Sequence, residues 1–124
     1  MLQVLLIGCG GFIGTIARYG VATMAYRLLG ASFPYGTLTV NILGCLLIGF
    51  VSIAAEERDM IAHSTRLFLT IGILGGFTTF SSFGYETLTL LRLGNIFPAT
   101  LYVLASVITG LAAVWLGGLL ARAV

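Results

Sequence analysis

Four long hydrophobic stretches, joined by short polar connections, make up almost the entire chain. Each is long enough to cross a bilayer, because a hydrocarbon core of about 30 Å is spanned by about 20 helical residues. The pattern predicts an all-α membrane protein, with residues 1–124 forming a single domain of four transmembrane helices. The expected spans are residues 2–29, 35–55, 67–93 and 98–122.

The connections carry the turn and charge signals. Gly30–Pro34 has the composition of a turn, and Pro98 suits the first turn of the last helix. The run Glu56–Arg66 is the one strongly polar stretch. It predicts a loop between the second and third spans.

Composition supports this interpretation and excludes other classes. Charged residues make up 8% of the chain, against about 25% in soluble domains, and the mean hydropathy is +1.11. The six positive charges are all arginine and form no basic run, so nothing indicates a nucleic-acid partner. Cys9 and Cys45 lie in apolar segments without the spacing of a metal site, so we expect two small buried residues.

The arginines set no clear orientation. With four spans, Arg58, Arg66 and Arg122 lie on one side of the membrane, and the other side carries Arg27 and Arg92. A difference of three to two is almost no bias under the positive-inside rule. We therefore expect the chain to insert both ways up and to form an antiparallel, dual-topology homodimer, in which two chains act as inverted repeats.

A glycine-rich start resembles a dinucleotide-binding turn but does not fit one. With Gly8 and Gly10 as the first two glycines of the motif, Ile13 occupies the position of the third. No acidic residue precedes Glu56 to bind a ribose. A helix with a glycine face fits better, because glycines four residues apart allow helices to pack closely.

The segment Gly72–Glu86 is the most informative part of the sequence. Inside a hydrophobic span it carries three closely spaced glycines, four serine and threonine hydroxyls, three phenylalanines and an acid. We expect a helix break at the glycines and the threonines that follow, with the rings on one face if the chain is helical there. Ring edges and hydroxyls both suit an anion without adding a full charge that would trap it. The residues are Gly72, Gly75, Gly76, Phe77, Thr78, Thr79, Phe80, Ser81, Ser82, Phe83 and Glu86.

Polar residues on the neighbouring spans extend this pattern. Thr37 and Asn41 are one turn apart on the second span, and Tyr102 and Ser106 are one turn apart on the fourth. The Asn41 amide must find partners in hydrocarbon, and either an anion or a neighbouring backbone satisfies it. Hydroxyls on three spans then form a continuous track.

Two ionisable groups within the spans have two interpretations each. Arg18 either snorkels to an interface or marks an anion vestibule. Glu86 is either a functional intramembrane acid or the partner of an arginine such as Arg18. Unwound carbonyls at the break need protein, water or a cation, and a two-fold axis there would gather two sets of carbonyls around a sodium ion.

Three motifs together resemble the Fluc (CrcB) fluoride channels of bacteria. They are Gly10-Gly-Phe-Ile-Gly-Thr-Ile-Ala-Arg18-Tyr, Pro34-Tyr-Gly-Thr-Leu-Thr-Val-Asn41-Ile-Leu-Gly44 and Gly75-Gly-Phe-Thr-Thr-Phe-Ser-Ser-Phe83, and the third is the most specific. The resemblance implies a dual-topology homodimer in the bacterial inner membrane. Two parallel pores would carry fluoride passively out of the cell.

The resemblance also implies roles for individual residues. Asn41, Phe80 and Phe83 match the pore asparagine and the two pore phenylalanines. Positions near the polar track match Thr37, Thr79, Ser81, Tyr102 and Ser106. Gly75 and Thr78 match residues whose carbonyls hold a central structural sodium ion. Glu86 matches an acidic position beyond the phenylalanines and Arg18 the first-helix arginine, as gate or vestibule residues.

Three other functions fit less well. A small multidrug-type exporter has a similar size but uses an acid in its first helix, and the first span here has none. A non-transporting assembly subunit explains the glycines but not the polar face of the third span. An enzyme needs a nucleophile, a base and an orienting group. A single loop histidine and scattered hydroxyls do not supply such a set.

Overall fold

The computed structural model describes all 124 residues and is entirely helical. Four helical spans are long and apolar enough to cross a membrane, which confirms the predicted fold class. The third span is a composite of several helical pieces, running from His63 to Arg92. In chain order the elements are α1 (Leu2–Leu29), α2 (Tyr35–Glu56), α3 (His63–Leu67), the π-helix η1 (Phe68–Leu74), α4 (Gly75–Phe77), α5 (Phe80–Arg92) and α6 (Ile96–Ala123).

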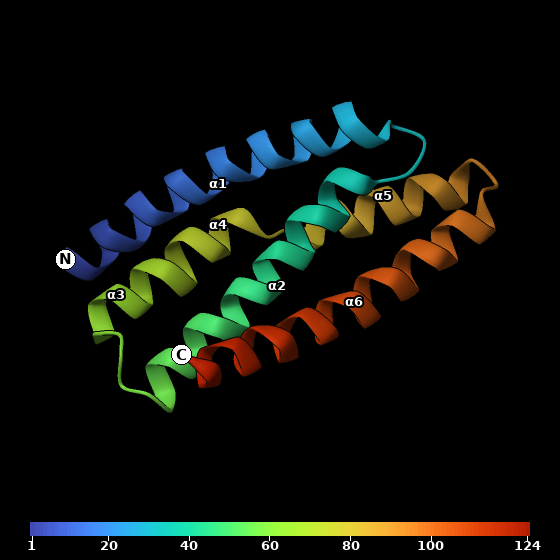
Figure 1. The fold of residues 1–124 in the computed structure, drawn as a ribbon. Helices are drawn as coiled ribbons and strands as arrows, with labels where there is room; N and C mark the ends of the chain where they lie inside the picture. Colours follow the sequence, from blue (N-terminus) through green and yellow to red (C-terminus); the bar gives the residue numbers. More distant parts are fainter.

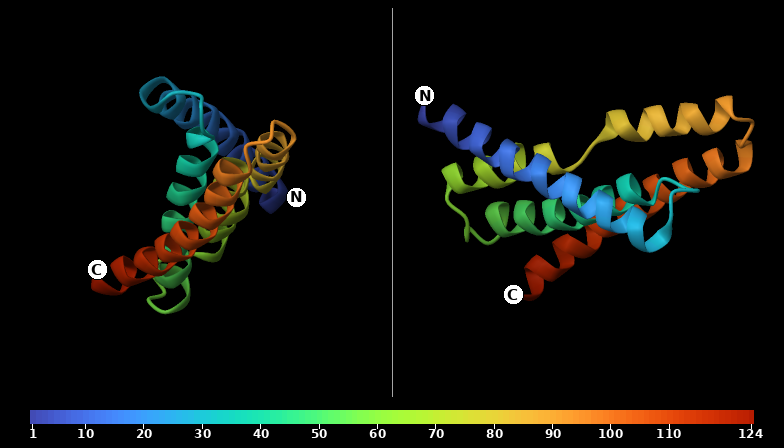
Figure 2. Two further views of the ribbon diagram at one scale, coloured as in Figure 1. Left: turned by 90° about the vertical axis from the view of Figure 1, so that its right-hand side faces the viewer. Right: turned by 90° about the horizontal axis from the view of Figure 1, so that it is seen from above.

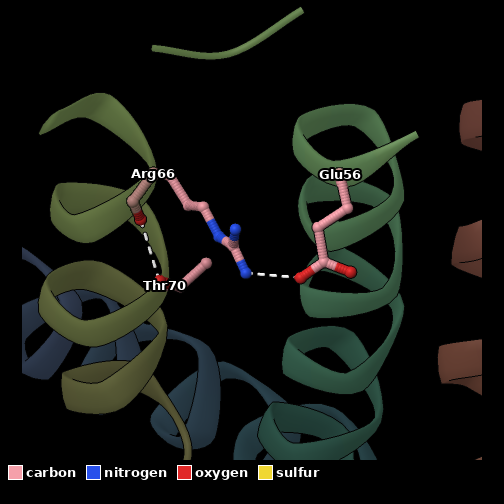
Figure 3. A network of polar contacts seen from close by, with 3 residues as sticks. All are labelled: Glu56, Arg66 and Thr70. Atoms are coloured by element: carbon pink, nitrogen blue, oxygen red, sulfur yellow. Dashed lines mark hydrogen bonds and ion pairs between the residues drawn. The ribbon is translucent and has the colours of Figure 1, made fainter. Parts of the chain in front are cut away.

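The loop between the second and third spans is shorter than expected. The prediction of a loop throughout Glu56–Arg66 is wrong, since α2 includes Glu56 and α3 begins at His63. A helical turn supplies its own backbone hydrogen bonds and tolerates polar side chains outside hydrocarbon. Arg66 of α3 forms an ion pair with Glu56 of α2, and Thr70 donates to the Arg66 carbonyl at 2.8 Å (Figure 3).

The third span breaks at two threonines. Thr78 and Thr79 have extended backbones, with ψ of 159° and 115°, and α5 starts at the next residue. Figure 2 shows the chain passing through an extended link between α4 and α5. The predicted break is confirmed at the threonines and wrong for the glycines, because Gly72 and Gly75 lie in helical backbone before it. β-Branched residues adopt extended backbone readily, which favours a break at the threonines.

The glycines of the third span serve packing against α1 instead. A Cβ added at Gly14 would lie 2.0 Å from the Ile73 carbonyl oxygen, and one at Gly76 would lie 2.5 Å from the Gly11 carbonyl oxygen. Backbone meets backbone here, as in other small-residue helix contacts within membranes. The first half of the third span is thereby fixed along α1 (Figure 1).

The second and fourth spans form the other tight pair. α2 packs on α6 over most of its length (Figure 1). A Cβ at Gly49 would lie 2.1 Å from the Val114 carbonyl oxygen, and one at Gly117 would lie 2.0 Å from that of Leu46. α5 is attached to neither pair through glycines; it packs on α6 through the apolar cluster of Leu90, Ala99 and Tyr102 and makes polar contacts as well.

The two ends of the molecule differ in charge. Figure 1 shows both termini and the α2–α3 connection at one end, with the α1–α2 and α5–α6 connections at the other. At the terminal end Arg122 donates to Glu57 at 2.7 and 2.8 Å. The Arg122 guanidinium hydrogen-bonds to this carboxylate and lowers the pKa of Glu57 below its usual value. The opposite end carries Arg27 and Arg92, neither in an ion pair.

Candidate functional site

Asn41 bridges α2 to the break in the third span. Its Nδ2 donates to the Thr79 carbonyl at 3.0 Å, and its Oδ1 accepts from the Thr79 amide at 2.9 Å. These two bonds replace partners that a continuous helix would have supplied to Thr79. We expected the Asn41 amide to bind either an anion or a neighbouring backbone, and the structure shows the backbone. One of the two Nδ2 hydrogens makes no bond within the chain.

Hydroxyl groups cluster where α5 begins. Thr79 is the N-cap of α5, and its buried Oγ1 accepts from the Ser82 amide at 3.2 Å. The same hydroxyl lies 3.0 Å from Ser82 Oγ and 3.3 Å from Ser81 Oγ. The positive end of the α5 dipole therefore meets three hydroxyls inside the span, which favours a nearby anion.

The three phenylalanines do not share one face. Phe77 ends α4 and is buried, whereas Phe80 starts α5 and is 82% exposed. The prediction of a common stripe is wrong for Phe77, because the extended residues between them reset the helical period. Phe80 and Phe83 do form a pair, with ring centroids 5.5 Å apart, and Phe83 continues to Tyr102 at 5.1 Å.

Glu86 is held by hydroxyls from three helices. Tyr102 donates to its Oε2 at 2.6 Å, while Thr37 and Tyr26 donate to Oε1 at 2.7 and 3.3 Å. An ion pair between Glu86 and Arg18, one of the two expectations, is wrong. Arg18 Nη1 instead lies 3.4 Å from the Thr78 carbonyl oxygen, at the long limit of a hydrogen bond.

Tyr26 is the member of this cluster that the sequence did not indicate. It lies near the end of α1, where an aromatic residue is expected at a membrane interface. Its contact with Glu86 joins residues 60 apart in sequence. No local pattern marks such a contact, which depends on where the fold places α1 and α5.

Ser106 has the only buried side-chain polar atom in the chain without a hydrogen-bond partner. It lies one turn after Tyr102 on α6. Leaving a buried hydroxyl unpaired costs about 1–3 kcal/mol, so a partner from outside the chain would stabilise this site. Thr109, nearby on α6, is already satisfied by the Ala105 carbonyl at 2.5 Å.

Two cavities that each contain a charged side chain lie on either side of the Thr37–Glu86 bond. The cavity around Arg18 has about 270 Å³ and is lined by Thr15, Thr37, Thr79 and Ser82. The cavity around Glu86 has about 300 Å³ and opens near the α1–α2 connection. Thr37 lines the first cavity and bonds the acid that lines the second, so this bond lies between the two cavities.

Gly75 and Thr78 line neither of these cavities. They line a third one of about 230 Å³ beside α2. In a continuous helix the Gly75 carbonyl would accept from the Thr79 amide, which here donates to Asn41. The Gly75 carbonyl therefore lacks that donor, and the Thr78 carbonyl accepts only the long Arg18 contact among the side chains. Backbone carbonyl oxygens are the donor type that hard cations prefer.

Comparison with known proteins covers almost the whole chain. The family model described as "CrcB-like protein, Camphor Resistance (CrcB)" matches residues 5–118. A protein of Geobacter sulfurreducens is 48% identical over 122 residues, covering 98% of each chain. One of Chlorobium chlorochromatii is 50% identical over 120 residues, covering 97% of this chain and 92% of its own. One of Chlorobium phaeobacteroides is 47% identical over 118 residues, covering 95% and 91%. All three are named "Fluoride-specific ion channel FluC".

Proposed function

The chain belongs to the CrcB family, and we propose that it is a fluoride-selective channel of the bacterial inner membrane that exports cytoplasmic fluoride passively. The observation that carries this proposal is the surface at the break of the third span. It combines the Phe80–Phe83–Tyr102 ring series with the hydroxyls and positive helix end at the start of α5. Such a surface has no use against lipid.

The chemistry suits a small, strongly hydrated anion. Fluoride gives up its water only to donors that replace it, and hydroxyls and ring edges are donors without a formal charge. Ser106 supplies an unused hydroxyl on α6, and Asn41 retains one unused amide hydrogen. We assign the pathway to Thr37, Asn41, Thr79, Phe80, Ser81, Phe83, Tyr102 and Ser106.

Glu86 and Arg18 serve the approaches to this pathway. Thr37 and Tyr102 each have one hydroxyl hydrogen, and both are donated to Glu86. An anion can take these donors only when the carboxylate releases them, so Glu86 acts as a gate. Arg18, in the other cavity, is the positive charge that attracts the anion into a vestibule.

A second copy in antiparallel orientation completes the channel. One chain buries only 22 of its 124 residues, and it leaves Phe80 82% exposed and Ser81 exposed beside it. The near-equal arginine counts at the two ends allow both orientations. Two identical copies related by a two-fold axis would then form two pores, each using surfaces of both chains.

We assign a structural sodium ion to the two-fold axis. The Gly75 and Thr78 carbonyls of two copies would supply four oxygens, and their lack of helical donors fits this role. The ion would hold the two breaks together and would take no part in conduction. Purification with N-methylglucamine replacing sodium is expected to lower the dimer fraction, and an unchanged dimer fraction would contradict the assignment.

Fluoride efflux from liposomes tests the proposal. Reconstituted protein is expected to release fluoride, measured with a fluoride electrode, and to hold back chloride in a matched preparation. Phe80→Ile and Phe83→Ile are expected to reduce fluoride release, with Phe12→Ile, an exposed ring on α1, as control. No fluoride release, or equal chloride release, would refute the channel. Unchanged release in both pore variants would show that the two rings only pack.

Adding two arginines to one end of the chain tests the dual topology. A single imposed orientation should leave each copy without an antiparallel partner. We expect activity to disappear in that variant alone and to return when a copy with the opposite bias is co-expressed. Full activity of the biased variant by itself would refute the antiparallel pairing.

A further inference from the structure

Phe33, on the connection between α1 and α2, packs directly on the ring series of the site. Its ring centroid lies 5.5 Å from that of Tyr102, at an interplanar angle of 80°, which is a T-shaped contact. Tyr102 then contacts Phe83, and Phe83 contacts Phe80. The series of aromatic contacts therefore starts outside the spans and reaches the break.

The local backbone holds the Phe33 ring in place. Gly30 has a φ of 87°, a conformation that favours glycine, and it ends α1 with a sharp turn. The Phe33 carbonyl accepts from the Tyr35 amide at 2.7 Å, and Pro34 restricts the backbone of the residue before it. Tyr35 also packs on Phe33, with centroids 5.1 Å apart.

Phe33 touches the residue on which the Glu86 cluster depends most. Tyr102 is fully buried and makes the shortest bond to Glu86, at 2.6 Å. A tyrosine hydroxyl lies far from its backbone, so a small rotation of the ring moves it out of hydrogen-bonding range. α6 fixes the Tyr102 backbone, and the Phe33 and Phe83 rings restrict its side chain.

Phe33 also lines the cavity that contains Glu86. Its ring therefore borders both the cavity through which an ion approaches and the tyrosine that donates to the acid. Phe97 provides a contrast at the same end of the molecule, because it is 77% exposed and forms no ring pair.

We propose that Phe33 is a positioning residue of the pore, which holds the Tyr102 hydroxyl at the place where it bonds Glu86 and, once the carboxylate releases it, donates to the passing anion. This inference rests on the proposed channel function. It assigns a pathway role to the α1–α2 connection, which otherwise only joins two spans. Phe33 acts through Tyr102 and needs no contact with the ion.

The test compares single and double variants in the liposome assay. Replacing Phe33 by leucine removes the ring but keeps an apolar side chain. A well-oriented aromatic pair contributes about 0.5–1.5 kcal/mol, so Phe33→Leu should reduce fluoride release by about 2- to 13-fold. Phe33→Tyr keeps the ring and should restore release to within about twofold of wild type, and Phe97→Leu should have no effect.

A double variant separates positioning from general packing. Tyr102→Phe removes the hydroxyl that Phe33 aligns, so adding Phe33→Leu to it should reduce release little further. An equal fold-reduction in both backgrounds would overturn the proposal, as would unchanged release in Phe33→Leu. If Phe33→Leu fails to form a monodisperse dimer, Phe33→Met takes its place in the same comparison. Release by the wild type separates this outcome from failure of the channel function itself.

Discussion

The close contact of α1 with the third span gives the sharpest test of the fold. Gly14→Ala places a Cβ 2.0 Å from the Ile73 carbonyl oxygen. Carbon and carbonyl oxygen approach to about 3.3–3.6 Å at closest, so the two backbones would have to separate by more than about 1 Å. Overpacking of this kind costs about 1–3 kcal/mol. The carbonyl oxygen belongs to the backbone and the position of the Cβ is fixed by the α1 backbone, so no side-chain rotation relieves the clash.

The same helix provides matched controls. A Cβ at Gly8 or Gly20 meets nothing within 4 Å, and alanine favours helix over glycine by about 0.5–1 kcal/mol. Gly8→Ala and Gly20→Ala should therefore be neutral or stabilising, although all three substitutions add the same methyl group to α1.

Heating in detergent measures the difference. The fraction of protein remaining in the monodisperse peak is followed by size-exclusion chromatography after each temperature step. The apparent midpoint of Gly14→Ala should lie at least about 3 °C below wild type, with Gly20→Ala at or above it. Equal midpoints for Gly14→Ala and Gly20→Ala would refute the backbone contact between α1 and the third span.

Three further predictions concern the polar contacts. Asn41→Leu leaves the Thr79 amide and carbonyl unpaired, which costs about 1–3 kcal/mol for each group. It should therefore lower both the apparent midpoint and fluoride release. Asn41→Asp keeps an acceptor for the Thr79 amide and should lower the midpoint less. Tyr102→Phe removes the 2.6 Å bond to Glu86 and should reduce fluoride release while shifting stability by only about 1 kcal/mol; wild-type release would contradict the role of this hydroxyl. Arg122 lowers the pKa of Glu57 in the folded protein. The pair therefore stabilises the end of α6 at pH values above the ordinary pKa of about 4.3, and this stabilisation is lost as the pH falls through the folded-state pKa. Hydrogen exchange at residues 119–123, corrected for its intrinsic rate, should become faster on acidification in the wild type and change less in Glu57→Gln.

The spans were predictable because bilayer thickness constrains them directly. A hydrophobic stretch of the required length has to be helical in lipid, so α1, α2 and α6 follow from composition to within about two residues. The polar residues around Glu56–Arg66 were harder to assign. Helical turns outside the hydrocarbon depend on caps and ion pairs such as Arg66–Glu56, which connect residues of separate elements.

The break was predicted in the right segment and at its threonines, but the glycines before them do not take part in it. Glycine marks both flexible backbone and close packing, and a single sequence does not separate the two uses. In the structure Gly72 and Gly76 face the backbone of α1, so these glycines serve close packing and not a flexible break. The partner of Glu86 was missed for the same reason, because three hydroxyls reach it from helices whose crossing the sequence does not specify.

The two halves of the third span are held by different forces, and this explains why the break lies between them. η1 and α4 are fixed by backbone contact with α1, whereas α5 packs on α6 around Leu90 and Tyr102 and is joined to the other helices by the polar bonds of Thr79 and Glu86. The backbone contact leaves no space for an ion, and the polar bonds consist of donors that an ion can take over. The extended backbone at Thr78 and Thr79 ends that packing and turns the hydroxyls and Phe80 towards the surface that a second copy would cover.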